Sequence, residues 1–144
     1  ISNHEDFREI VEFNGINFYD DYGHHPTEIK ATTKALKEHT QGKLIVVFQP
    51  HRYTRTRDNF NDLSKSFEYS DLTLITDIYS AGEKPIPGVS SLMFESEKIK
   101  YVKSPRMVPP YLKNNISPGD TVLTIGAGDI TLLGPQILKY LNEN

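Results

Sequence analysis

Cysteine is absent from this chain of 144 residues. Its absence excludes a disulfide framework and a zinc site built on thiolates, and it fits a cytoplasmic protein. Long apolar runs are also missing, since none approaches the ~20 residues that a membrane-spanning helix needs. The opening stretch, ISNHEDFREI, is polar and charged, so no secretory signal is expected there. These absences predict a cytoplasmic protein without a membrane partner.

An excess of basic residues is also missing. The 16 Lys and Arg side chains are outnumbered by 19 Asp and Glu, which leaves a net charge of −3. A general nucleic-acid surface needs the opposite balance to neutralise phosphates, so no nucleic-acid partner is expected. The phosphate-loop pattern G-x-x-x-x-G-K-[ST] does not occur either. The chain therefore cannot cradle the phosphates of ATP by that route.

The sequence does contain an alternation of apolar strands with helical segments. A hairpin is predicted around Asn14 and Gly15, because both residues tolerate the positive φ angles of a tight turn. Pro26 suits the first turn of a helix, which is expected to run until Gly42 stops it. Further apolar strands are predicted at residues 43–49, 71–79, 98–103 and 121–128.

A second helix is predicted between the first two of these strands, because Phe60, Leu63 and Phe67 recur at helical spacing and share one face. Thr56 is its expected N-cap. The fold class is therefore α/β, with a doubly wound, Rossmann-like and mostly parallel sheet, flanking helices and an N-terminal β-hairpin. We expect residues 9–144 to form one domain and residues 1–8 to be a linker or foreign residues.

Polar, charged and glycine-rich residues gather in four loops that follow the predicted strands. These loops cover residues 20–26, 49–58, 77–88 and 126–130. In open α/β sheets, ligands bind beyond the carboxyl ends of the strands. Because the strands themselves stay apolar, the unusual residues fall on one rim of the sheet, and that rim is the predicted site.

The second loop, QPHRYTRTRD, is rich in cationic side chains. Arg52 and Arg55 have the forked guanidinium geometry that captures a carboxylate or a phosphate. The alternative is a solvated helix start, in which these arginines pair with Asp58 or Asp62. Their position at a strand end favours the binding of a small anion.

His24 and His25 in the first loop allow three interpretations. With the neighbouring aspartates and His51 they could bind a metal, but adjacent residues rarely supply two ligands to one ion, so no metal site is expected. A histidine near neutral pKa could instead accept a proton from an amine. Equally, the histidines could cap the helix that begins at Pro26.

The fourth loop, GAGDITLLG, is a weak match to a dinucleotide-binding motif. After Gly126 and Gly128, the next glycine is Gly134, and no ribose-binding acid follows it. The spacing of that motif is therefore wrong. Two glycines before a helix start indicate a turn that tolerates an anion.

Four blocks of the sequence resemble, in order, the C-terminal domain of the Mur ligases. They are DDYGHHPTEIKAT, VVFQPHRYTRTRDNF, TDIYSAGEKPIPGVSS and VLTIGAGDI. The resemblance covers nearly the whole chain and is strongest to the branch that joins L-alanine to UDP-N-acetylmuramate. The branch that recycles murein tripeptide begins similarly but lacks a block like QPHRYTRTRD. One departure is Glu5-Asp6, where the family tends to carry a basic pair before the phenylalanine.

The resemblance implies a three-domain, ATP-dependent ligase of peptidoglycan synthesis in the bacterial cytoplasm. Its N-terminal domain would hold UDP-N-acetylmuramate, and its central domain would supply the phosphate loop and bind most of the ATP and Mg. ATP would activate the muramate carboxylate as an acyl phosphate, which the amine of L-alanine attacks. The present domain would close over these substrates and would be inactive alone.

The resemblance also implies roles for single residues. The substrate-binding residues would be Arg52, Arg55, Tyr22 and His51. Arg52 and Arg55 would grip the carboxylate of L-alanine, His24 would be the catalytic residue beside the incoming amine, and Asp21 would face the nucleotide. A stand-alone module that binds a small anion without chemistry is the alternative, and an encoded phosphate loop upstream would discriminate between the two.

Overall fold

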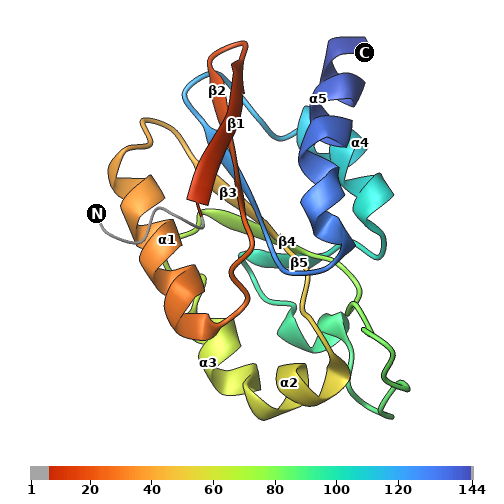
Figure 1. Ribbon diagram of the computed structural model, residues 1–144. Coiled ribbons are helices and arrows are strands. Elements are labelled where there is room, and N and C mark those ends of the chain that lie inside the picture. The colour runs from red at the N-terminus through yellow and green to blue at the C-terminus, as the bar shows by residue number, and fades with distance from the viewer. Residues whose placement is uncertain (1–6, 144) are drawn as a thin grey trace.

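A mostly parallel sheet forms the centre of the molecule (Figure 1). The computed structural model describes residues 7–143, and within that range the sheet has six strands in the order β1-β2-β6-β3-β4-β5. β1 is antiparallel to β2, and the other neighbouring strands are parallel. The α/β class and the mostly parallel sheet are therefore confirmed. The strands are β1 (Phe7–Phe13), β2 (Ile16–Asp21), β3 (Leu44–Phe48), β4 (Leu72–Ile75), β5 (Ile99–Tyr101) and β6 (Thr121–Ile125).

The N-terminal hairpin turns at Asn14 and Gly15, as predicted. Their φ angles are 52° and 82°, the left-handed pair that a two-residue primed turn needs. β1 begins at Phe7. Most of the predicted linker at residues 1–8, including Glu5-Asp6, lies outside the described residues, so the linker stays a prediction.

The central strands β3 and β6 are buried on both faces, which explains their continuous apolar sequences. In β3, Ile45 and Val47 belong to one core cluster, while Leu44, Val46 and Phe48 belong to the other. This division follows the period of two with which side chains alternate across a strand. A sheet with a core on each face needs helices on both sides.

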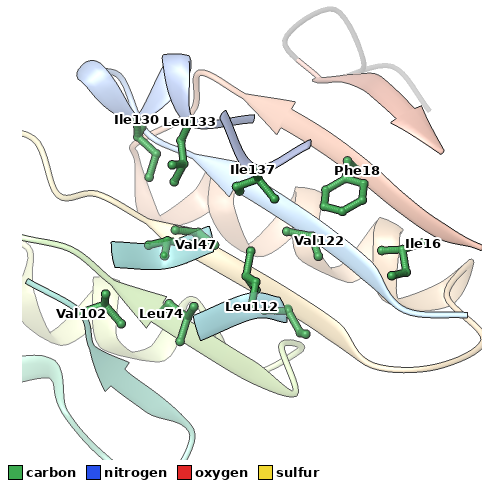
Figure 2. Packing of buried hydrophobic residues seen from close by; sticks show 12 residues of the cluster. Ile16, Phe18, Val47, Leu74, Val102, Leu112, Val122, Ile130, Leu133 and Ile137 are labelled. Carbon is green, nitrogen blue, oxygen red and sulfur yellow. The ribbon is translucent and has the colours of Figure 1, made fainter. Parts of the chain in front are cut away.

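Helices cover both faces, which confirms the predicted doubly wound arrangement (Figure 1). α1 and α3 supply Ile29 and Leu63 to the cluster on one face. α4 and α5 cover the other face, and Figure 2 shows Leu112 of α4 and Ile137 of α5 packed with Val122 of β6. The helices are α1 (Pro26–Glu38), α2 (Tyr53–Asp58), α3 (Phe60–Lys65), α4 (Val108–Lys113) and α5 (Leu133–Glu143), with short 3-10 turns η2 (Ser91–Phe94), η3 (Pro105–Met107) and η4 (Asp129–Leu132).

Two predicted helix boundaries were wrong. Thr56 is not an N-cap, because it lies buried inside α2, where its hydroxyl donates a hydrogen bond to the carbonyl of Arg52 at 2.7 Å. α1 ends at Glu38 with His39 as its C-cap, so Gly42 is not the residue that stops it. Gly42 serves close packing instead, since a Cβ there would lie 2.3 Å from Oδ1 of Asp120.

α4 was not predicted at all. Its sequence, VPPYLK, contains Pro109 and Pro110, which suggest a break in a helical pattern. Both prolines lie in the first turn, where a backbone N–H would lack an intrahelical partner anyway, so the helix tolerates them. Across residues 7–143, none of the helices is long and apolar enough to cross a bilayer.

Candidate functional site

The loops after β2, β3, β4 and β6 meet at one edge of the sheet, as predicted. The rings of His24 and His51, from the first two loops, lie 5.9 Å apart between centroids. The ring of His51 stacks on that of Tyr79, from the third loop, at 5.5 Å and 19°. Nε2 of Gln49 donates to Oδ1 of Asp129, in the fourth loop, at 2.5 Å. The side chains of all four loops are therefore joined at the carboxyl ends of the strands.

The two histidines of the first loop have different surroundings. His25 is the N-cap of α1, and its Nδ1 accepts a hydrogen bond from the backbone N–H of Thr27 at 3.4 Å. Glu28 completes the capping box by accepting from the N–H of His25 at 3.1 Å. The helix-cap interpretation therefore applies to His25. His24 is half-buried, and its Nδ1 is buried without a hydrogen-bond partner among the described residues.

Asp21 and Tyr22 also differ, although they are neighbours. The side chain of Asp21 is only 2% exposed. Its carboxylate accepts hydrogen bonds from the N–H of Gly23 at 2.8 Å and from the hydroxyl of Thr32 at 2.9 Å. Asp21 thus holds the first loop against α1. Tyr22 is 46% exposed and lies on the surface of the rim.

Arg52 occupies an unusual backbone position at the start of α2. Its φ of 72° and ψ of 140° are rarely adopted by a residue with a side chain. Such a conformation costs of the order of 1–3 kcal/mol and persists where the surrounding structure holds it. The N–H of Arg52 donates to the carbonyl of Tyr79 at 2.8 Å, and the N–H of Tyr79 donates to the carbonyl of Pro50 at 2.9 Å. The third loop therefore fixes the residue that carries the first arginine of the rim.

His51 and Arg55 form a pair beside this position. Nη1 of Arg55 lies 3.4 Å from Nδ1 of His51. Burial lowers the pKa of His51, and the nearby charges of Arg55, His24 and Arg52 lower it further, while Glu83 acts in the opposite direction. The neutral form of His51 is therefore favoured, and in that form its Nδ1 is suited to accept a hydrogen bond from Arg55.

The alternative in which Arg52 and Arg55 pair with the acids of the same segment is not favoured by the contacts. Asp58 pairs with Arg57, whose Nε lies 2.9 Å from Oδ1 of Asp58. Arg52 is exposed to solvent, and Arg55 is half-buried against His51. Among the described contacts, neither Arg52 nor Arg55 forms an ion pair with Asp58.

The fourth loop packs so closely against the second and third loops that it requires glycine. A Cβ at Gly128 would lie 2.6 Å from Oε1 of Gln49 and 2.6 Å from Cγ of Tyr79. Gly126 has a φ of 150°, and a Cβ there would lie 2.8 Å from Cγ2 of Ile130. The glycines of GAGDI thus permit close packing of the loop on β3 and on Tyr79.

Sequence reasoning missed three residues that build this rim: Gln49, Tyr79 and Glu83. Gln49 is buried and also accepts a hydrogen bond from the N–H of Ile130 at 3.1 Å. The carboxylate of Glu83 accepts from the N–H of Tyr53 at 2.6 Å. Tyr79 lies in the third of the predicted loops, and an aromatic residue in a loop that follows an apolar strand was the signal that could have indicated it. Within residues 7–143, His, Asp and Glu side chains form no group of three or more that could hold a metal ion.

The fold and the rim define the class of protein. The family model described as "Mur ligase, glutamate ligase domain" matches residues 7–128. The chain therefore belongs to the Mur ligase family, as the four sequence blocks predicted. It is homologous to the family's ligases of peptidoglycan precursor synthesis.

The similar curated proteins are UDP-N-acetylmuramate–L-alanine ligases. The enzyme of Pelotomaculum thermopropionicum is 46% identical over 145 residues, which cover 96% of this chain and 32% of that protein. The enzyme of Desulforamulus reducens is 41% identical over 144 residues, which cover 95% and 31%. The chain thus spans about a third of the length of the curated relatives it matches.

Solved structures share the fold. The UDP-N-acetylmuramate–alanine ligase MurC of Thermotoga maritima superposes with a TM-score of 0.73 at 21% identity, covering 94% of this chain and 29% of that one. A murein peptide ligase of Psychrobacter arcticus also gives 0.73, at 18% identity, covering 94% and 29%. A domain from a Haemophilus ducreyi ligase gives 0.70 at 22% identity, covering 93% of this chain and 98% of that one. That structure is a single domain of this kind, crystallised without the rest of its protein.

Proposed function

We propose that this chain is the amino-acid-binding C-terminal part of an ATP-dependent UDP-N-acetylmuramate–L-alanine ligase. The observation that carries the proposal is the meeting of Arg52 and Arg55 with His24 and His51 at the carboxyl ends of the strands. The identity of 41–46% to ligases of that name supports the choice of L-alanine. The solved structures, all below 25% identity, support the fold alone.

Arg52 and Arg55 bind the carboxylate of L-alanine in this proposal. Charge-assisted hydrogen bonds to a carboxylate are worth about 1.5–3 kcal/mol each, and the guanidinium fork matches the planar anion. Arg52 is solvent-exposed, so a substrate can reach it. Nη1 of Arg55 is directed at His51, and its other N–H groups remain for the substrate. His51 and Tyr22 also contact the substrate in this proposal, beside the arginines.

His24 acts at the amine. In the proposed reaction, the muramate carboxylate is first phosphorylated by ATP, with release of ADP. The amine of L-alanine then attacks the acyl carbonyl, phosphate leaves, and the nitrogen loses a proton as the amide forms. His24 is suited to hold or accept that proton because its buried Nδ1 has no hydrogen-bond partner within the described chain.

ATP, Mg and UDP-N-acetylmuramate are assigned mainly to other domains of the full-length protein. The phosphate-loop pattern is absent from these residues, so this domain contributes by closing over the nucleotide. Asp21 supports that role by holding the first loop in place, because its carboxylate is engaged with Gly23 and Thr32. We assign the protein to the bacterial cytoplasm, and we expect the isolated domain to be inactive.

The proposal is tested by ADP release from the full-length chain supplied with ATP, Mg and UDP-N-acetylmuramate. Three samples are compared: added L-alanine, added murein tripeptide and no amine. Turnover that requires L-alanine is the expected result. Turnover with tripeptide alone would place the protein in the recycling branch. No turnover with either amine would favour a binding module for small anions.

A further inference from the structure

Glu83 connects the third loop of the rim to the start of α2. Its carboxylate accepts hydrogen bonds from the backbone N–H of Tyr53 at 2.6 Å and from that of Thr54 at 3.1 Å. The hydroxyl of Thr54 donates to the same carboxylate. These are the first residues of α2, and its N-cap, Arg52, makes no side-chain cap of its own.

This contact replaces a local helix cap by a long-range one. The first N–H groups of a helix lack intrahelical partners, and a side chain just before the helix usually satisfies them. Here the acceptor comes from a different loop of the rim. The position of α2, and with it the origin of the Arg52 and Arg55 side chains, therefore depends on the loop of residues 77–88.

The same loop holds the backbone of Arg52 from the other side. The N–H of Arg52 donates to the carbonyl of Tyr79 at 2.8 Å, while the carboxylate of Glu83 binds the N–H groups of Tyr53 and Thr54. The left-handed φ of 72° at Arg52 lies between these two attachments. Removing the Glu83 attachment takes away the hydrogen bonds that tie the first residues of α2 to the third loop. The strained residue Arg52 then keeps its bonds to Tyr79 and Thr56 but loses the support beside it, so it can shift from its position.

Glu83 also decides which groups an anion can use. Hydrogen bonds, chiefly from the hydroxyl of Thr54, lower the pKa of Glu83, so it is charged at neutral pH. The carboxylate occupies the N–H groups of Tyr53 and Thr54. An anionic substrate must therefore bind through the guanidinium groups of Arg52 and Arg55 rather than through the backbone of the helix start.

We infer that Glu83 is a positioning residue for the amino-acid substrate, which it affects without contact by fixing the arginines at the start of α2. This inference rests on the proposed function, because it assumes that those arginines bind the substrate carboxylate. It predicts that loss of Glu83 weakens binding of the amino acid and leaves binding of ATP nearly unchanged.

The experiment compares Glu83→Gln with Glu95→Gln in the full-length chain. Glutamine keeps the size of the side chain but removes the negative charge of the carboxylate, to which the N–H groups of Tyr53 and Thr54 both donate. Glu95 is a matched control, since its carboxylate also accepts a backbone N–H, that of Tyr101 in β5 at 3.1 Å, away from α2. We expect the KM for L-alanine to rise about tenfold in Glu83→Gln, because small misplacements of positioned groups have effects of this order or larger.

The remaining results are expected to separate positioning from general stability. The KM for ATP should change less than about twofold in Glu83→Gln, since no nucleotide contact is removed. Glu95→Gln should leave both constants unchanged. Equal rises in the two KM values, or a change in kcat alone, would overturn the inference.

Hydrogen–deuterium exchange of the same full-length proteins gives a readout that does not depend on activity. The peptide containing Tyr53 and Thr54 should exchange faster in Glu83→Gln than in wild type or in Glu95→Gln. Unchanged exchange of that peptide would refute the claim that Glu83 holds the start of α2, whether or not the enzyme is active. A wild-type chain that turns over without L-alanine would instead refute the proposed function, so the two failures are distinguishable.

Discussion

Gly128 and Gly82 separate two physical reasons why a loop position requires glycine. Gly128 has a φ of −99°, which other residues adopt freely, but a Cβ there would lie 2.6 Å from both Gln49 and Tyr79. Gly82 has a φ of 89° and nothing within 4 Å of a Cβ. Gly126 combines both problems, with a φ of 150° and a Cβ position 2.8 Å from Ile130.

The cost of an alanine can be worked out for each position. For Gly82→Ala, the left-handed backbone costs about 1–2 kcal/mol, and the less flexible unfolded chain returns about 0.4–1 kcal/mol. The net destabilisation is therefore about 0–1.6 kcal/mol. For Gly128→Ala, overpacking costs about 1–3 kcal/mol before the same offset, because Gln49 is buried and held by Asp129. Gly126→Ala incurs both costs, so we expect about 2–4 kcal/mol.

Urea unfolding of the isolated domain would measure these differences, and the domain from Haemophilus ducreyi shows that a comparable unit can be studied alone. The expected order of destabilisation is Gly126→Ala, then Gly128→Ala, then Gly82→Ala. Gly128→Ala should also shift the ring resonances of His51, because Tyr79 is exposed enough to swing away from that ring. The reasoning fails if Gly82→Ala is as damaging as Gly126→Ala, or if Gly128→Ala changes neither stability nor His51.

Three further predictions concern charged and titratable groups. Arg52→Ala should raise the KM for L-alanine about 10- to 100-fold with little effect on the KM for ATP, and equal rises would contradict the carboxylate assignment. In wild type, the free energy of unfolding should decrease as the pH falls below 6.5. The lowered pKa of His51 in the folded chain means that the unfolded chain binds a proton more readily there. Arg55→Gln should raise the pKa of His51, measured by NMR titration, and should thereby weaken that pH dependence; an unchanged pKa would contradict the pairing. Burial and the hydrogen bond to Asp77 raise the pKa of Tyr101 to about 12, so its stabilising contribution is present below pH 10 and is lost as pH rises towards 12. Tyr101→Phe should remove this late step from the ultraviolet titration of the tyrosines, and a late step that persists would refute the assignment.

The strands of the fold were predictable because their signal is local. The continuous apolar runs of β3 and β6 reflect burial on both faces, and Asn14 and Gly15 carry the turn preference of the hairpin in their own side chains. The strand order was not predictable in the same way. β6 inserts between β2 and β3, and nothing in those segments alone indicates their neighbour.

Helix boundaries failed where tertiary contacts replace local signals. Thr56 matches the residue type of an N-cap, yet α2 begins earlier because Glu83 caps it from another loop. Gly42 matches the residue type that ends helices, yet its role is to let Asp120 approach. In both cases the residue type is typical of the predicted role. The actual helix boundary and the actual role of the residue depend on contacts with residues distant in the sequence.

In the candidate site, too, residues with unusual local chemistry could be predicted, whereas residues that matter through tertiary contacts could not. Arg52, Arg55, His24 and His51 could be selected from sequence because their chemistry is unusual at a strand end, and the structure places them on one rim. The roles that the family resemblance implies for them remain proposals. Gln49, whose position matters as much, could not be selected, since its importance arises only where its amide joins Asp129 and Ile130.

In the proposed function, different residues of this rim bind the substrate and hold the binding residues in place. The guanidinium of Arg52 is exposed, while the groups that fix its backbone are the carbonyl of Tyr79 and the carboxylate of Glu83 beside it. A backbone held in a strained conformation has little freedom to lose when a ligand arrives, which favours binding. In the proposed function the strain at Arg52 has a physical use, because contacts within the domain offset it and fix the backbone from which the side chain extends before any substrate is present.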